Sequence, residues 1–127
     1  MGGALRALGL AALLAACTGK GVEDSGGPCA RSPALTYDNF GHGFLNQYCN
    51  GCHSSIVPDN HREGAPPSVN FDTYEGVLTW ADRIQARAVS DDASMPPGGG
   101  PGTEDRALLD EWITCTVLDE KARWEAE

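Results

Sequence analysis

Three side chains near the middle of the chain could do chemistry together. The segment Cys49-Asn50-Gly51-Cys52-His53 is a C-x-x-C-H motif. Thiols at positions i and i+3 of a helical turn project to one side, and an imidazole at i+4 joins them there. Two such thiols can form thioethers to the two vinyl groups of one haem, with the imidazole held beneath the iron as proximal ligand. The motif therefore predicts one covalent haem c on Cys49 and Cys52, with His53 bound to the iron.

The same residue types also occur in zinc knuckles and in thioredoxin-like redox pairs. A structural zinc site needs a second pair of ligands at similar spacing, and the sequence contains no second pair. A thioredoxin-like pair belongs in a βαβ context, and no strand-like alternation persists along this chain. The haem interpretation is therefore the one that the sequence favours.

Residues 1–16 have the pattern of a bacterial signal peptide. Arg6 precedes an apolar run that is too short to span a bilayer. The run ends in LAAC at Cys17, which resembles the lipobox of bacterial lipoproteins. That resemblance implies cleavage before Cys17 and a diacylglycerol on its sulfur. It also implies anchoring to a membrane facing the periplasm, with the outer membrane favoured because Thr18 follows. An ordinary signal peptide with an incidental cysteine is the alternative.

The rest of the chain divides into a tether and one domain. Residues 17–28 are rich in Gly and contain Val22 as their only aliphatic residue, and they predict a lipidated flexible tether. Residues 29–127 predict a haem domain. Export supports this assignment, because c-type haem attachment takes place outside the bacterial cytoplasm.

Three helices must position the motif, over about 37–48, about 73–89 and from 103 to as far as 124. Each has apolar residues at helical spacing. Gly41 and Gly43 weaken the first helix, so we expect another element to cross it closely there. The long loops 54–70 and 90–102 lie between the helices and are expected to hold something.

The ends of the helices also carry signals. Asp72 or Thr73 is the predicted N-cap of the second helix, and Thr103 is the predicted N-cap of the third.

The motif and its surroundings resemble the class I cytochrome c family over residues 36–120. In that family a glycine lies eight residues before the first haem cysteine and an apolar residue lies four before it, matched by Gly41 and Leu45. They cross a C-terminal helix with an aliphatic and an aromatic residue three apart, matched by Leu109 and Trp112. The resemblance implies a small all-α fold, with about three main helices and long loops around one covalent haem.

Members of this family place a methionine on the distal face of the iron. Met95 lies 42 residues after His53 and is followed by two prolines, which restrict its loop. The resemblance therefore implies Met95 as the distal ligand. Its alternative role is to fill a gap in the core. His61, His42 or an open position are the other possibilities for the distal site, although His61 lies in a polar segment expected to be a solvated loop.

Two cysteines are left once Cys17, Cys49 and Cys52 have these roles. An even number of unassigned cysteines in an exported protein predicts a disulfide, here between Cys29 and Cys115. The alternative is two unpaired thiols.

The leading functional prediction is a non-enzymatic, membrane-tethered electron carrier. A haem enzyme or a gas or redox sensor would instead need a weak or open distal site. A structural lipoprotein would use haem only to stabilise its fold. The formal charge of −9 argues against nucleic-acid binding and favours a basic redox partner. We expect the domain to be monomeric. Arg83 and Arg87 lie one helical turn apart and could meet haem propionates or remain an exposed pair.

Overall fold

The computed structural model describes residues 26–90 and 92–127. Over these ranges the chain forms helices and loops and contains no strand, so the predicted all-α class is confirmed. The α-helices are α1 (His42–Tyr48), α2 (Tyr74–Ile84), α3 (Thr103–Trp112) and α4 (Leu118–Trp124). Shorter π- or 3₁₀-helical segments extend or join them: η1 (Tyr37–Gly41), η2 (Asp59–His61), η3 (Gln85–Val89) and η4 (Ile113–Val117).

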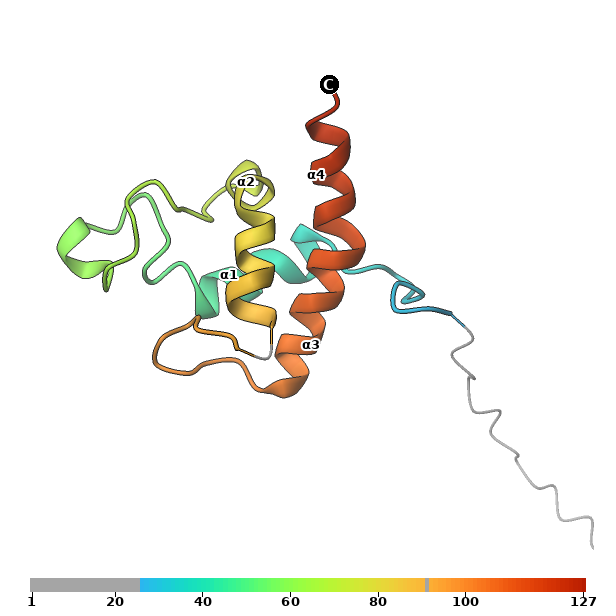
Figure 1. Cartoon of the computed structure of the whole chain (residues 1–127), viewed down its shortest axis with the longest axis horizontal. Coiled ribbons are helices and arrows are strands. Elements are labelled where there is room, and N and C mark those ends of the chain that lie inside the picture. The colour runs from blue at the N-terminus through green and yellow to red at the C-terminus, as the bar shows by residue number, and fades with distance from the viewer. Residues whose placement is uncertain (1–25, 91) are drawn as a thin grey trace, which may run out of the picture.

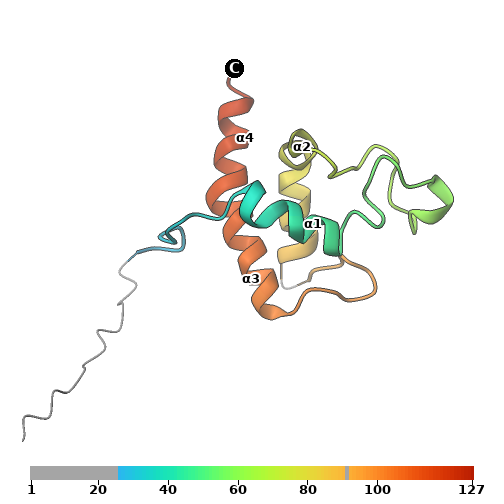
Figure 2. The same cartoon turned by 180° about the vertical axis from the view of Figure 1, so that it is seen from behind.

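These segments join into three continuous helical stretches, 37–48, 74–89 and 103–124. The three predicted helices are therefore confirmed to within a residue at their ends. In Figures 1 and 2, α2 and the α3–α4 stretch run alongside each other and α1 crosses them. The loop that follows α1 lies at the opposite end of the molecule from the N-terminal segment in both views.

Side-chain caps explain where two of the stretches begin. Thr36 accepts a hydrogen bond from the amide of Asn39 (3.1 Å), and the Asn39 side chain accepts one from the amide of Thr36 (2.7 Å). Thr73 caps α2 by accepting from the amide of Gly76 (3.2 Å), which confirms one of the two predicted caps. Such bonds satisfy amides that lack a partner within the helix.

The predicted cap of the third helix is wrong. Thr103 is the first residue of α3, and the N-cap is Gly102, which has no side chain to make a capping bond. Glycine is an acceptable N-cap because its backbone readily takes the non-helical conformation required there.

The crossing of the first and third stretches depends on Gly41. A Cβ atom built on Gly41 would lie 2.1 Å from Cζ2 of Trp112, so only glycine lets the two helices approach this closely. Trp112 and Leu109 are 0% exposed, and Leu45 is almost as buried. The expected close crossing is confirmed at Gly41. At Gly43 it is wrong, because no atom lies within 4 Å of a Cβ built there and the residue is exposed.

Apolar faces of all three stretches form one core. The second stretch contributes apolar residues at helical spacing, as predicted, and Phe71 from the preceding loop joins them. The buried hydrophobic residues are Phe44, Leu45, Phe71, Val77, Leu78, Ala81, Ile84, Ala88, Leu109, Trp112, Ile113 and Val117. Burial of these side chains is the main favourable contribution to stability.

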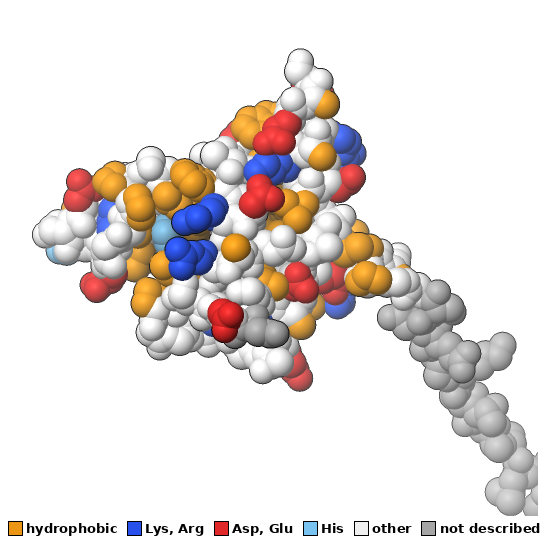
Figure 3. All heavy atoms as spheres, viewed as in Figure 1, with side chains coloured by type: hydrophobic (Ala, Val, Ile, Leu, Met, Phe, Trp, Pro, Cys, Tyr) orange, Lys and Arg blue, Asp and Glu red, His pale blue; other side chains and the backbone are white. Residues whose placement is uncertain are grey.

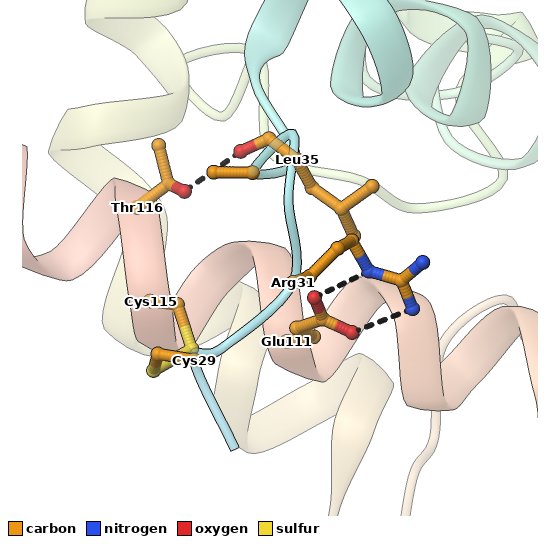
Figure 4. A pocket seen from close by; sticks show the side chains of 7 residues that line it. Cys29, Arg31, Leu35, Glu111, Cys115 and Thr116 are labelled. Carbon is orange, nitrogen blue, oxygen red and sulfur yellow. Dashed lines mark hydrogen bonds and ion pairs between the residues drawn. A yellow bond between two sulfur atoms is a disulfide. The ribbon is translucent and has the colours of Figure 1, made fainter. Parts of the chain in front are cut away.

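A disulfide between Cys29 and Cys115 fastens the N-terminal segment to η4, which confirms the predicted pair. Figure 4 shows its surroundings. Arg31 donates to both carboxylate oxygens of Glu111 (2.6 and 2.9 Å), and Thr116 donates to the carbonyl of Leu35 (2.7 Å). Three types of bond therefore hold this segment against the third stretch.

Two further predictions concern the start of the chain. The signal peptide at 1–16 and the lipidation site Cys17 lie outside the described residues, as does most of the tether at 17–28. Among the helices that are described, none is long and apolar enough to cross a membrane.

Candidate functional site

The C-x-x-C-H motif forms a tight turn directly after α1. Cys49 is the C-cap of α1, and its amide donates to the carbonyl of Leu45 (2.8 Å). The carbonyl of Cys49 then accepts from the amides of Cys52 (3.1 Å) and His53 (2.9 Å). These bonds bring both thiols and the imidazole onto one turn. Cys49 and Cys52 are unpaired, and both are half-buried.

The imidazole of His53 has one nitrogen engaged by the protein. Its Nδ1 lies 3.0 Å from the carbonyl oxygen of Val69. Because a carbonyl can only accept, Nδ1 carries the proton in this contact, and in the neutral imidazole Nε2 then has a free lone pair. A neutral imidazole in this tautomer is the form that binds a metal through Nε2.

Phe71 fixes the orientation of the same ring. The rings of His53 and Phe71 are stacked, with centroids 4.8 Å apart and an interplanar angle of 27°. The amide of Phe71 also donates to the carbonyl of His53 (2.8 Å). Since Phe71 belongs to the apolar core, His53 is attached to the rigid part of the molecule as well as to its loop.

Burial affects the first thiol of the motif. It raises the pKa of Cys49 to about 12, because a thiolate is poorly solvated among packed atoms. The thiol is therefore protonated at neutral pH and is a weak nucleophile in the folded chain.

Met95 lies on the loop between the second and third stretches. It is half-buried and packs against the hydrophobic core. Its amide donates to the carbonyl of Arg87 (2.9 Å), and its own carbonyl accepts from Arg106 (3.0 Å). The backbone of Met95 is thus attached to both neighbouring helices.

The two other histidines considered as distal ligands are exposed. His42 lies on α1, with its Nε2 3.1 Å from the side-chain amide of Asn46. His61 ends η2 on the long loop after the motif.

Arg62 was not identified from the sequence. Its segment was predicted to be a solvated loop, which is wrong for this residue, since Arg62 is only 2% exposed. The backbone turns back immediately afterwards, at Glu63 (φ 50°) and Gly64 (φ 85°). One signal could have revealed it: Arg62 is the only Lys or Arg between residues 54 and 70, and the carbonyls of a compact loop need donors.

Asp72 joins the two ends of this loop. Its carboxylate accepts from the amide of Ser55 (2.6 Å). Burial alone would raise the pKa of Asp72, but hydrogen bonds from Ser54 and Ser55 and the nearby charge of Arg62 outweigh that effect and lower it. The carboxylate is therefore ionised when it stabilises the loop.

Exposed basic side chains occur on the second stretch although the chain as a whole is acidic. Arg83 and Arg87, on the second stretch, are both exposed, and Arg87 donates to the hydroxyl of Ser94 (3.3 Å). In Figure 3, Lys or Arg side chains lie next to hydrophobic side chains and a histidine.

The donor set fits a covalently attached haem. It comprises two unpaired thiols three residues apart and an imidazole with a free Nε2. In the part of the chain that the structure describes, no three His, Cys, Asp or Glu side chains are grouped so as to hold a metal ion by themselves.

Comparisons with known proteins give no relative. No family model, curated protein or solved structure matches the chain. The functional argument therefore depends on the residues of this site.

Proposed function

We propose that the chain is a single-haem c-type cytochrome, with a fold of the class I cytochrome c type, that carries electrons between protein partners. The observation that carries the proposal is the turn at 49–53. It presents two unpaired thiols and an imidazole whose Nδ1 is occupied by Val69. In this proposal Cys49 and Cys52 hold one haem c covalently, and His53 is its proximal ligand.

Pairing of the remaining cysteines supports this assignment. Cys29 and Cys115 form a disulfide with each other, so the motif cysteines are the unpaired ones among the described residues. The close crossing at Gly41 and Trp112 also agrees with the helix crossing of the class I family. Neither feature would be required of a zinc knuckle.

Met95 is the proposed distal ligand. Its loop is attached to the second and third stretches, whereas His42 and His61 are exposed. A haem bound between a histidine and a methionine supplies reversible one-electron chemistry. The role of the chain is then to hold the two ligands rigidly and exclude water. With both axial positions filled, the protein has no substrate site at the iron and acts as a carrier rather than an enzyme.

We further propose that the mature protein is an exported lipoprotein. Cys17 would carry the lipid and anchor the domain to a membrane facing the periplasm, with the outer membrane favoured. A basic redox partner would be steered by the acidic chain. A Cys17→Ser variant should appear in the soluble fraction, and its retention with membranes would contradict the anchor.

Haem attachment can be tested with two double variants, one of which is the control for the other. The wild type should show the mass of one added haem and retain it after denaturation and acid extraction. Cys49→Ser with Cys52→Ser should abolish covalent haem, because both thioether sulfurs are removed. Cys29→Ser with Cys115→Ser removes the same number of cysteines and should leave haem attached. A wild type purified after co-expression with a cytochrome c maturation system that still lacks covalent haem would refute the proposal.

A further inference from the structure

The carbonyl oxygen of Val69 accepts two hydrogen bonds. One comes from Nδ1 of His53 (3.0 Å), and the other comes from Nη2 of Arg62 (3.0 Å). A carbonyl oxygen has two lone pairs and can accept both. The guanidinium of Arg62 and the imidazole of His53 therefore share one acceptor, the Val69 oxygen.

Arg62 also bonds to the backbone directly after His53. Its Nη1 donates to the carbonyl of Ser54 (2.6 Å), the residue directly after His53. Its remaining contacts are with Ala65 (3.2 Å), Pro66 (2.9 Å) and the side chain of Asn70 (2.8 Å). Among the described residues no carboxylate forms an ion pair with Arg62. Its hydrogen bonds go to neutral oxygens, and its charge also interacts with the nearby carboxylate of Asp72, whose pKa it helps to lower.

We propose that Arg62 is a positioning residue that sets the strength of the hydrogen bond between His53 and Val69, and through it the reduction potential of the site. This inference rests on the proposed function. A charged donor withdraws electron density from the Val69 oxygen, which makes that oxygen a weaker acceptor for Nδ1–H. The imidazole then has less anionic character and stabilises ferric iron less.

The charge itself acts in the same direction. A buried positive charge close to the site disfavours the more positive ferric state, because little water is present to screen it. Both effects raise the reduction potential. A neutral residue at position 62 removes both effects, whereas a lysine keeps the charge and loses most of the contacts.

The experiment compares haem-loaded Arg62→Gln, Arg62→Lys and wild type by spectroelectrochemistry. At a fixed ambient potential, the ratio of ferrous to ferric protein should fall on the order of tenfold in Arg62→Gln. Arg123→Gln is the matched control, because it removes the same charge from an exposed ion pair on α4. It should leave the ratio within about twofold of the wild type.

A second readout separates an electronic effect from simple loosening of the loop. In the diamagnetic ferrous protein, the NMR signal of the His53 Nδ1 proton should move downfield in Arg62→Gln, because Val69 becomes a stronger acceptor. An upfield shift or loss of the signal would indicate a merely structural role and would overturn the inference. A ratio equal to that of Arg123→Gln would overturn it as well.

Arg62→Lys keeps the test decisive if Arg62→Gln does not fold. It should lose stability and show a fall of about threefold in the ferrous-to-ferric ratio, because it retains the charge but loses most of the contacts. A ratio equal to that of Arg123→Gln would overturn the inference. A wild type without haem would refute the proposed function and this inference together, whereas a haem-loaded wild type with unchanged variants refutes this inference alone.

Discussion

The crossing of η1 with α3 and the loop around His53 are held together in different ways. At the crossing, Gly41 lies against a tryptophan that is 0% exposed, and the contact is apolar. In the loop at 54–70, the single side chain of Arg62 donates to four backbone carbonyls and one side-chain oxygen. Apolar packing depends on shape and area, whereas hydrogen bonds depend on direction.

This difference separates stability from positioning. Apolar contacts between the helical stretches supply most of the favourable free energy, since it grows with buried area. Directed bonds in the loop, together with the stacked ring of Phe71, set the orientation of one ring, His53. We therefore expect changes in the scaffold to alter the free energy of unfolding strongly, and changes in the loop to alter the site at a smaller cost in stability.

Removal of the disulfide should have the largest effect on stability. Cys29→Ser with Cys115→Ser opens a link across 86 residues and should lower the free energy of unfolding by about 4 kcal/mol on the chain-entropy model. Urea denaturation measures the loss, and reduction of the wild type should reproduce it. The visible spectrum of the haem-loaded protein should stay unchanged. A changed spectrum would show that scaffold and loop are coupled.

The helix crossing is tested by two glycines of the same helical stretch. Gly41→Ala places a methyl group against Trp112 and should destabilise the protein by about 3 kcal/mol through overpacking. Gly43→Ala meets no neighbour and should stabilise it by about 0.5 to 1 kcal/mol, because alanine is the better helix former. Thermal unfolding of both variants measures the two changes in stability. Equal effects would contradict the assigned crossing.

Met95 belongs to both regions, since it packs on the core but lies on a loop. Met95→Ala should cost about 2 kcal/mol, at the low end for losing a methionine side chain, because the residue is only half-buried. If it is the distal ligand, the variant should keep covalent haem, show a lower reduction potential and bind carbon monoxide. Carbon monoxide binding by the wild type would instead favour the enzyme or sensor alternative.

Asp72 should give the smallest effect. Asp72→Asn should lower stability by about 1 kcal/mol at pH 7, because the carboxylate bonded to Ser55 loses its charge. The pKa of Asp72 is lowered by folding, so its contribution is complete above about pH 4 and disappears as the pH falls through the folded-state pKa. The difference between variant and wild type, measured by urea denaturation, should shrink in acid.

A carboxylate in the same loop provides the control for this pH dependence. Asp59 is exposed, and Asp59→Asn should change stability by less than about 0.5 kcal/mol at either pH. A constant difference between Asp72→Asn and the wild type from pH 7 to acid would contradict the assigned role of the carboxylate.

Features encoded by local pattern were predictable from the sequence. Apolar spacing gave the three helices within a residue at their ends, and cysteine parity gave the Cys29–Cys115 pair. The close approach at Gly41 was predictable because glycine weakens a helix, so its presence inside one indicates that another element crosses closely. Gly43 carries the same signal without the same neighbour, since no local rule states which face of a helix another element will cross.

The loop around the site could not be predicted in the same way. The segment around Arg62 reads as polar and solvated, but the backbone reverses at Glu63 and Gly64 and turns the guanidinium inward. Its partners are backbone carbonyls, which every residue has. The sequence therefore drew attention to Cys49, Cys52 and His53, but it did not reveal Arg62, which bonds to Ser54 and Val69 beside His53.

The disulfide of Cys29 also determines how a mechanical load would pass through the molecule. A pull on the N-terminal segment is delivered at Cys115, within the 103–124 helical stretch, instead of peeling residues 30–36 from the surface. The loop at 54–70 lies at the far end of the molecule from that attachment point (Figures 1 and 2). If the proposed lipid anchor and haem are present, the loop beside His53 lies at the end of the domain away from that anchor.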